Sequence, residues 1–208
     1  MHLVKADKEH LKAALSEAAE VLGRGGIVAC PTESSYGLCA RYDDQNALER
    51  LFRLKGRTRE KPFPLVIGET GKLAALASGV WPAALKLASE FWPGPLTVLL
   101  NARAGLSELL SREGKVAVRV PGPSFALELA RSFGLPMTAT SANPSGLAPA
   151  TSAGEVQDYF GDSVDLIVDG GESPGGPPST IVDVTLGEIK VLREGAISLD
   201  EIKARLGF

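Results

Sequence analysis

Apolar residues recur every three or four positions in several stretches of the chain, and this spacing predicts amphipathic helices. The clearest stretch runs from Leu11 to Leu22. Asp7 is its expected N-cap, and the glycine-containing segment 23–26 is its expected end. The pattern therefore places a helix of about three turns close to the N-terminus.

Two Ser-x-x-Glu pairs mark the starts of later helices. Ser152 with Glu155, and Ser198 with Glu201, have the spacing of capping boxes. The predicted helices cover residues 11–22, 47–54, 83–91, 124–133, 152–160 and 198–205.

Short apolar runs between these helices predict buried strands. The predicted extended segments cover residues 26–31, 64–67, 96–102, 116–121, 136–140, 165–169, 179–184 and 189–193. Strands alternate with helices through most of the chain and cluster near its end. We therefore predict an α/β fold with one mixed sheet and helices on at least one face.

Composition narrows the class of protein. With 44% hydrophobic residues, the 208-residue chain can bury a full core as one domain, residues 1–208. A formal net charge of −3 argues against a protein coated in nucleic acid but allows a local basic patch. The N-terminus lacks the apolar core of a signal peptide, and no apolar run approaches the ~20 residues of a membrane span. We expect a soluble cytoplasmic protein without membrane attachment.

Residues that commonly bind metals or act as nucleophiles are few. Cys30 and Cys39 lie in apolar stretches, which favours reduced core thiols over a disulfide or a metal pair. His2 and His10 are the only histidines. A histidine-based triad is therefore not expected, and neither is a protein-bound metal.

Five loops combine glycine or proline with hydroxyl, amide or basic side chains: PTESSYG, KGRTREKP, TSANPSG, GGESPGGPPST and LREGA. Loops at strand ends are where α/β folds bind ligands. If these loops converge, Ser and Thr hydroxyls, one Asn and several Lys and Arg line a concave site that suits phosphate and carboxylate. Taken singly, PTESSYG and TSANPSG can be capped turns, and the Gly/Pro-rich run can be an ordinary surface loop.

One of these loops is strongly basic. Alternate positions just after a predicted helix carry Lys55, Arg57, Arg59 and Lys61. In an extended segment these side chains would point to one side and form an anion-binding edge. Arg119 and Arg193 lie near the ends of two predicted strands, beside such loops, which favours this interpretation over a solvated cationic loop.

Common nucleotide-binding and metal-binding motifs are absent from the sequence. There is no G-x-x-x-x-G-K-[ST], no G-x-G-x-x-G that opens a helix, no C-x-x-C and no H-E-x-x-H. Trp81 and Trp92 are interpreted as packing residues of the core or its rim. Composition and spacing alone thus predict an anion-binding α/β protein.

Taken together and in order, these segments resemble the YrdC/TsaC family, which makes threonylcarbamoyl-AMP. The resemblance covers roughly residues 26–197 and rests on the blocks PTESSYGL, KGR…KPFPLVI, FWPGPLTVLL, VAVRVP, TSANPSG, GG…PSTIVDVT and VLREGAI. The Lys-x-Arg and Ser-x-Asn pairs of the family match Lys55–Arg57 and Ser141–Asn143. The resemblance implies a YrdC-like single domain, in which a twisted mixed sheet and flanking helices surround a concave basic cavity.

The resemblance also implies a reaction. L-threonine, bicarbonate and ATP, with Mg²⁺ on the phosphates and no tightly bound cofactor, would give threonylcarbamoyl-AMP and pyrophosphate. A separate transferase complex would pass the threonylcarbamoyl group to tRNA, forming threonylcarbamoyladenosine. Weak binding of tRNA or other RNA is compatible with this role.

Residue roles follow from the same resemblance. Catalytic roles are implied for Lys55 and Arg57. ATP contacts are implied for Arg57, Lys61, Lys115, Ser141, Asn143 and Arg193. L-threonine contacts are implied for Thr32, Ser34, Arg119, Ala139 and Ser179, with Arg119 on the carboxylate.

Three positions depart from the family pattern. Ser34 stands where many members have threonine, Thr58 where proline is usual, and Pro149 where some members have a serine that contacts nucleotide. An alternative function is a double-stranded RNA-binding or ribosome-maturation factor that uses the same basic cavity. The acidic pI of about 5.5 argues against this alternative as the main role.

Overall fold

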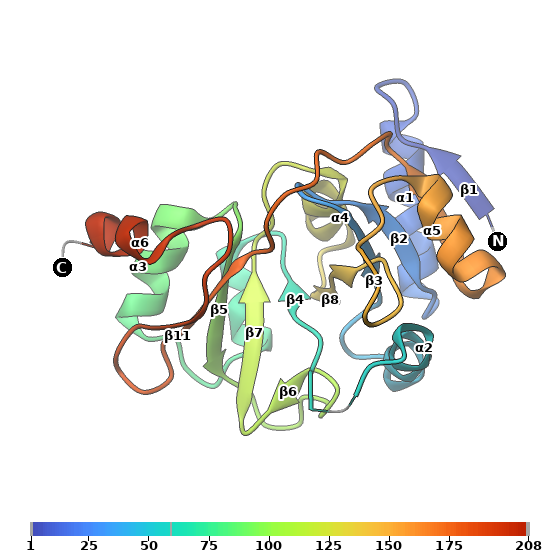
Figure 1. Cartoon of the computed structure of the whole chain (residues 1–208). Coiled ribbons are helices and arrows are strands. Elements are labelled where there is room, and N and C mark those ends of the chain that lie inside the picture. The colour runs from blue at the N-terminus through green and yellow to red at the C-terminus, as the bar shows by residue number, and fades with distance from the viewer. Residues whose placement is uncertain (1, 59, 207–208) are drawn as a thin grey trace.

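The computed structural model describes residues 2–58 and 60–206 and contains two β-sheets with helices around them (Figure 1). The α-helices are α1 (Leu11–Gly23), α2 (Gln45–Lys55), α3 (Pro82–Phe91), α4 (Phe125–Phe133), α5 (Ala153–Phe160) and α6 (Leu199–Leu206). Two short 3₁₀-helices are η1 (Thr70–Ala75) and η2 (Gly161–Ser163).

The first sheet, sheet A, has the strand order β1-β10-β2-β3-β9. Its strands are β1 (His2–Lys5), β2 (Val28–Pro31), β3 (Tyr36–Cys39), β9 (Thr140–Ser141) and β10 (Leu166–Asp169). The first three in spatial order run parallel, and β3 and β9 continue the sheet in antiparallel pairs.

The second sheet, sheet B, has the order β12-β11-β5-β7-β4-β8, and β6 pairs with β7 beside this path. Its strands are β4 (Leu65–Val66), β5 (Leu96–Asn101), β6 (Ser111–Arg112), β7 (Lys115–Arg119), β8 (Met137–Thr138), β11 (Thr180–Asp183) and β12 (Lys190–Arg193). Parallel and antiparallel pairs alternate across it.

The predicted mixed α/β class is confirmed, and each predicted helix and strand is present to within a few residues, except that the predicted extended segment 136–140 is divided into β8 of sheet B and β9 of sheet A. The prediction of one sheet is wrong, because the strands divide between two. Strands β1 and β6 were not predicted, and β3 was missed because PTESSYG was interpreted as a loop. In the structure only residues 32–35 form a turn, and Tyr36 already pairs with Pro31 of β2.

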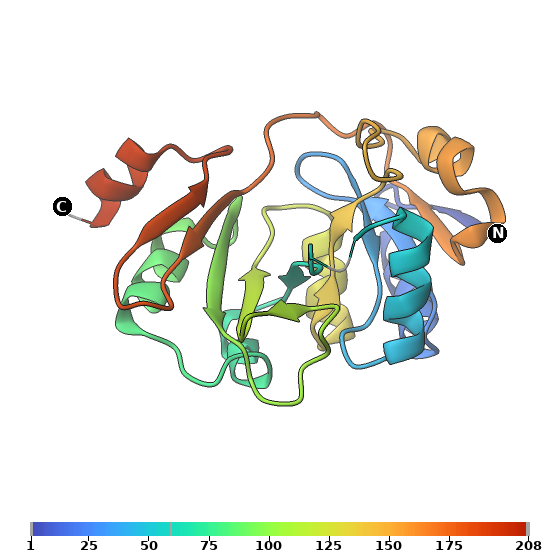
Figure 2. The same cartoon turned by 60° about the horizontal axis from the view of Figure 1, so that its bottom comes forward.

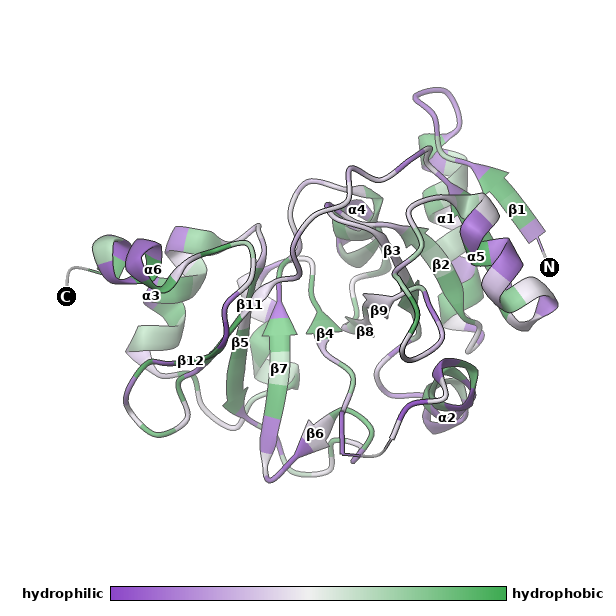
Figure 3. Ribbon diagram, viewed as in Figure 1, coloured by the Kyte–Doolittle hydropathy of each residue, from purple (hydrophilic) through white to green (hydrophobic). Residues whose placement is uncertain are grey.

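Alternation along β2 directs its side chains to two different layers. Val28 and Cys30 face a cluster that includes apolar residues of α1 and α4. Ala29 belongs to the main core cluster, together with apolar residues of α2 and α5. Sheet A is therefore covered on both faces, which explains the continuously apolar sequence of its central strand. Figure 3 shows the same apolar character along the strands that the helices enclose.

Helix ends agree with the predicted capping residues in most cases. Ser152 accepts from the backbone N–H of Glu155 (3.2 Å), and Ser198 accepts from that of Glu201 (3.1 Å). The prediction for Asp7 is wrong by one turn: its carboxylate accepts from the N–H groups of Glu9 and His10, which precede α1. His10 is the N-cap of that helix and makes no side-chain cap.

Three connections pass between the sheets and shape the space there. One of them leads from β3 of sheet A through α2 to β4 of sheet B. Ala139 joins β8 of sheet B directly to β9 of sheet A. Residues 170–179 lead from β10 of sheet A to β11 of sheet B, and both views show this segment crossing from one half of the molecule to the other (Figures 1 and 2).

The predicted core residues differ in burial. Cys30 and Cys39 are buried free thiols with their Sγ atoms 3.8 Å apart, as expected. Trp92 is half-buried and donates to the carbonyl of Leu96 (2.7 Å), whereas Trp81 is 47% exposed. Among the helices within residues 2–58 and 60–206, none combines the length and the apolarity that crossing a bilayer requires.

Candidate functional site

A cavity of about 500 Å³ lies between the two sheets. It is bordered by the turn after β2, the segment after α2, strands β5, β7 and β9, the crossing segment and β12. Eight of the predicted site residues line it: Thr32, Ser34, Arg57, Arg119, Ala139, Ser141, Ser179 and Arg193. The predicted convergence of separate loops on one cavity is confirmed for these residues.

The hydroxyl-rich turn 32–35 is held by Thr32. Its Oγ1 donates to the carbonyl of Ser35 (2.7 Å) and accepts from the backbone N–H groups of Ser34 (3.2 Å) and Ser35 (3.3 Å). The Thr32 hydroxyl is thus committed to the shape of the turn. Ser34 is less buried and lines the cavity, so its hydroxyl is the better placed of the two for a ligand.

Lys55, the last residue of α2, supports the cavity without lining it. Its Nζ donates to the carbonyl oxygens of Ser141 (2.6 Å) and Asn143 (2.6 Å) and to Oδ1 of Asn143 (3.0 Å). Burial, and secondarily the charge of Arg57, lower the pKa of Lys55 to about 8. Since an ammonium has three N–H donors, these contacts occupy all of them. The catalytic role implied for Lys55 would require contact with a ligand, whereas the observed lysine faces the protein.

Asn143 has a similar supporting position. Its Oδ1 accepts from the Ser141 hydroxyl (2.6 Å), and its Nδ2 donates to the carbonyls of Pro144 (3.0 Å) and Leu147 (2.7 Å). Asn143 is buried and outside the cavity lining, whereas Ser141 lines it. The Ser-x-Asn pair thus joins one lining residue to the residue that holds it in place.

Arg57 turns back toward the cavity just after Gly56, whose φ of 56° ends α2. Its guanidinium donates to the carbonyls of Lys61 (2.5 Å) and Pro62 (3.1 Å) and to Oγ1 of Thr140 (3.3 Å). Burial lowers the pKa of Arg57. These contacts fix the guanidinium of Arg57 in the cavity wall.

The expected extended row of cations is not observed. Lys55 still belongs to α2, as its last residue. The backbone N–H of Lys61 donates to the carbonyl of Thr58 (3.1 Å), so this segment forms a turn. Lys61 is exposed and outside the cavity lining. Arg59 lies outside the described residues. The prediction assumed an extended segment whose side chains alternate, but the segment forms a turn.

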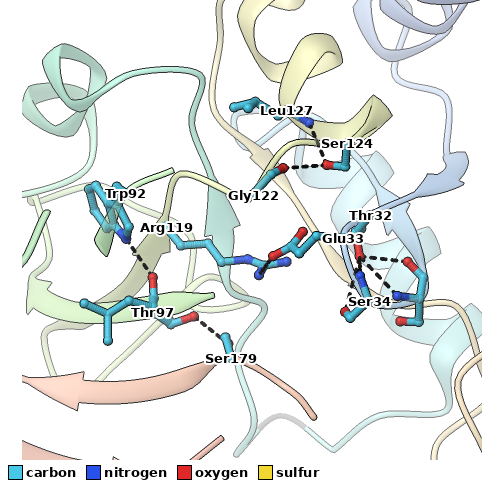
Figure 4. Close-up of polar contacts among 12 residues, drawn as sticks. Thr32, Glu33, Ser34, Trp92, Thr97, Arg119, Gly122, Ser124, Leu127 and Ser179 are labelled. Carbon is cyan, nitrogen blue, oxygen red and sulfur yellow. Dashed lines mark hydrogen bonds and ion pairs between the residues drawn. The ribbon is translucent and has the colours of Figure 1, made fainter. Parts of the chain in front are cut away.

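Arg119 ends β7 and lines the cavity, and it pairs with a residue that the predictions omitted. Its Nη1 lies 2.5 Å from Oε1 of Glu33, and the side chains are 12% and 17% exposed. Figure 4 shows these two side chains meeting between the sheets. Glu33 belongs to the conspicuous PTESSYG loop, and that was the only signal for it in the sequence.

Ser179 is the centre of a second polar group in the cavity wall. Its hydroxyl lies 2.8 Å from Oγ1 of Thr97, and its carbonyl accepts from Nη2 (2.6 Å) and Nε (3.2 Å) of Arg193. Burial and the nearby charge of Arg119 lower the pKa of Arg193. Thr97 also lines the cavity and was missed, because it lies within the apolar strand LTVLLN.

Lys115 does not reach the cavity. It begins β7, four residues before Arg119, which along a strand corresponds to roughly 13 Å. Its Nζ forms an ion pair with Asp183 (2.7 Å), and it is outside the lining. The predicted contact between Lys115 and a nucleotide therefore has no support in this arrangement.

Known proteins are similar to this chain in sequence and in fold. A family model named for Sua5, YciO and YrdC, and described as "Telomere recombination", matches residues 20–195. The threonylcarbamoyl-AMP synthase of Pyrococcus abyssi is 38% identical over 191 residues, which are 91% of this chain and 56% of the relative. The threonylcarbamoyl-AMP synthase of Thiobacillus denitrificans is 38% identical over 169 residues, 81% of this chain and 89% of the relative.

Solved structures extend the similarity to three dimensions. P. abyssi Sua5 complexed with L-threonine superposes with a TM-score of 0.90 at 37% identity, covering 99% of this chain and 60% of that one. Escherichia coli YciO superposes with a TM-score of 0.82 at 28% identity, covering 97% and 98%. The resemblance to the YrdC/TsaC family is thereby confirmed. The chain belongs to the Sua5/YciO/YrdC family.

Proposed function

We propose that this protein is an L-threonylcarbamoyladenylate synthase, which forms threonylcarbamoyl-AMP and pyrophosphate from L-threonine, bicarbonate and ATP. The single observation that carries the proposal is one cavity lined by three arginines and several hydroxyls, in a chain whose relatives bear the synthase name. The chain spans about half the length of the P. abyssi relative but 89% of the T. denitrificans one.

The cavity lining suits the three substrates. Arg57 and Arg193 offer positive charge for the phosphates of ATP, and Ser141 lines the same cavity with a hydroxyl. Arg119 offers a partner for the carboxylate of threonine. Ser34 and Ser179 offer hydroxyls that can pair with the threonine hydroxyl, a contact that rejects amino acids without one.

The proposed chemistry needs positioning and charge more than a dedicated base. The amine of threonine combines with bicarbonate, losing water, to give a carbamate. A carbamate oxygen then attacks the α-phosphorus of ATP, and the bond from that phosphorus to the bridging oxygen of pyrophosphate breaks. Both reactants are anions, so guanidinium groups fixed by Lys61, Pro62 and Ser179 carbonyls lower the repulsion between them.

Magnesium would enter this site with ATP. Among the described residues, no group of three His, Cys, Asp or Glu side chains could hold a metal ion. Mg²⁺ would therefore be bound chiefly by phosphate oxygens and water, as is common for nucleotide sites. When bound, the ion would neutralise charge on the phosphates.

The product defines the expected partners. Threonylcarbamoyl-AMP is a mixed anhydride, and we propose that a separate transferase consumes it to modify tRNA in the cytoplasm. The RNA-binding alternative, a ribosome-maturation factor, has no specific observation in its favour.

A single assay tests the proposal. Purified protein with ATP, Mg²⁺ and bicarbonate should release pyrophosphate only when L-threonine is added, and mass spectrometry should detect threonylcarbamoyl-AMP. Omission of bicarbonate, or replacement of L-threonine by L-valine, provides the controls. Pyrophosphate release that ignores threonine would reject the proposal. RNA binding without any threonine-dependent reaction would favour the alternative.

A further inference from the structure

Glu33 and Arg119 connect the two sheets at the edge of the cavity. Glu33 lies in the turn after β2 of sheet A, whereas Arg119 is the last residue of β7 in sheet B. Figure 4 shows their side chains approaching from opposite sides. Arg119 lines the cavity and Glu33 does not, so the carboxylate holds the guanidinium from outside the space for a ligand.

The aliphatic part of the Glu33 side chain packs against Gly122. A Cβ added at Gly122 would lie 3.3 Å from Cγ and 3.4 Å from Cβ of Glu33. Contacts this short are tighter than side chains normally make, so a larger residue at position 122 would crowd this part of the side chain. Glu33 therefore packs against bare backbone just three residues after Arg119, and both ends of its side chain contact the same stretch of chain.

The ion pair is made through one oxygen only. Oε1 of Glu33 accepts from Arg119, while Oε2 is buried and has no hydrogen-bond partner among the described residues. A buried carboxylate with an unpaired oxygen costs free energy, so this ion pair adds little to the stability of the fold. The contact uses one of the five N–H donors of the guanidinium. This geometry orients Arg119 and leaves donors for a second anion.

Glu33 also makes Arg119 different from the other two arginines of the cavity. Within residues 2–58 and 60–206, the hydrogen bonds of Arg57 and Arg193 go to neutral oxygen atoms. Arg119 alone of the three is paired with a carboxylate. Its charge is therefore largely balanced, whereas the other two retain theirs for a multiply charged ligand.

We propose that Glu33 is a positioning and specificity-determining residue. It aims Arg119 at the singly charged carboxylate of the amino-acid substrate and lowers the attraction of that arginine for polyphosphate. ATP is thereby directed to Arg57 and Arg193. The inference rests on the proposed function, because that function assigns the amino acid to Arg119.

The experiment compares the wild-type protein with Glu33→Ala and Glu33→Gln. In Glu33→Ala, the dissociation constant of L-threonine by calorimetry and its KM should both rise at least about 10-fold, while the KM of ATP stays unchanged. In Glu33→Gln, the amide oxygen can still accept from Arg119, so L-threonine affinity should return to within about threefold of wild type. The same variant should be inhibited at least about 10-fold more strongly by tripolyphosphate in competition with threonine.

Asp165→Asn is the matched control. Asp165 is a half-buried carboxylate that also pairs with an arginine, Arg50 (3.0 Å), but it is not part of the cavity lining. This variant should lower the melting temperature without changing L-threonine affinity. A merely structural role for Glu33 predicts the same behaviour for the Glu33 variants.

Two outcomes separate the inference from the proposed function. Wild-type protein that binds no L-threonine would overturn both. Wild-type binding together with unchanged threonine affinity in a folded Glu33→Ala protein would overturn the inference alone. If Glu33→Ala does not fold, Glu33→Gln decides, and unchanged tripolyphosphate inhibition in that variant would overturn the role in specificity.

Discussion

The ammonium group of Lys55 donates to three oxygen atoms of the segment from Ser141 to Asn143. A Lys-x-Arg motif in a basic loop predicts two cations facing one ligand, yet here the lysine faces the protein and only Arg57 faces the cavity. Lys55 thus contributes to the site by ordering the loop that carries Ser141. Its titration gives a test of that role.

We expect the loop to loosen as the pH rises through about 8. Burial lowers the pKa of Lys55 to about 8 from an ordinary value of 10.5. The neutral amine has two N–H groups for three acceptors, so one hydrogen bond is lost above that pH. The side-chain amide signals of Asn143 in NMR spectra should therefore shift with a midpoint near pH 8, and pyrophosphate release should decline over the same range.

The effect of Lys55 on global stability has the opposite sign to its effect on the loop, so the two effects can be distinguished. Between about pH 8 and 10.5 the unfolded chain holds the Lys55 proton and the folded chain does not. The contribution of this group to the free energy of unfolding therefore increases with pH in that window. A loop that loosens in this pH range would therefore not be a result of global unfolding. The side-chain amide of Gln45, which donates to Glu49 (3.1 Å), is the internal control, and a flat Asn143 titration up to pH 9.5 would refute the role.

At the scale of elements, the crossing segment 170–179 is held against the turn after β12. The N–H of Ala196 donates to the carbonyl of Pro178 (2.9 Å). A Cβ added at Gly195 would lie only 2.0 Å from that carbonyl oxygen and 2.8 Å from the carbonyl carbon of Ser179. Only glycine allows this close approach, and the approach sets where Ser179 and Arg193 face the cavity.

Gly195→Ala should therefore disturb both stability and binding. Because the clash is with backbone, the segment must shift, and overpacking of this kind costs about 1–3 kcal/mol of unfolding free energy. The displaced Ser179 should also weaken L-threonine binding. Urea unfolding and calorimetry measure the two effects.

Gly71→Ala is the control for this change. Gly71 is exposed, and an added Cβ there has no atom within 4 Å. The control should change the unfolding free energy by less than about 0.5 kcal/mol. If Gly195→Ala behaves like the control, the close approach has no role in fixing the site.

At the scale of the whole molecule, periodicity predicted the mixed α/β class because each helix has one apolar face and each central strand is buried. Periodicity could not assign strands to sheets. The division depends on pairings such as Tyr36 with Pro31, and on the single residue Ala139 between β8 and β9. Neither feature has a periodic signal, so the cavity between the sheets had no direct signature in the pattern.

The candidate site was predictable to a similar degree. Residue types that are unusual in an apolar context, such as Arg119 and the hydroxyls of PTESSYG, identified the walls of the cavity. Spacing did not reveal which cations face inward, because Lys115 pairs with Asp183 and Lys55 with carbonyl groups. Such partners come from segments distant in sequence. Thr97 was missed because it lies within an apolar strand, where nothing in the sequence distinguishes it from a core residue.

Because the cavity walls belong to both sheets, substrates should act as bridges that stabilise the whole fold. Arg119 comes from sheet B and Ser34 from the turn of sheet A, so a ligand that contacts both binds only the folded state. At 100 times its dissociation constant, one ligand adds about 2.7 kcal/mol to the free energy of unfolding. For a chain of this size that corresponds to a rise in melting temperature of roughly 5–11 °C.

L-threonine and an α,β-methylene analogue of ATP should each raise the melting temperature, measured by calorimetry or dye-free fluorescence. The effect of the analogue should fall between 0.1 and 1 M NaCl, because in the proposed function Arg57 and Arg193 attract the phosphates by charge, and salt screens that attraction. D-threonine is the matched control, since it has the same groups in the wrong arrangement. Equal shifts with D- and L-threonine would mean that the amino acid does not bridge the sheets through the contacts proposed for Arg119 and Ser34.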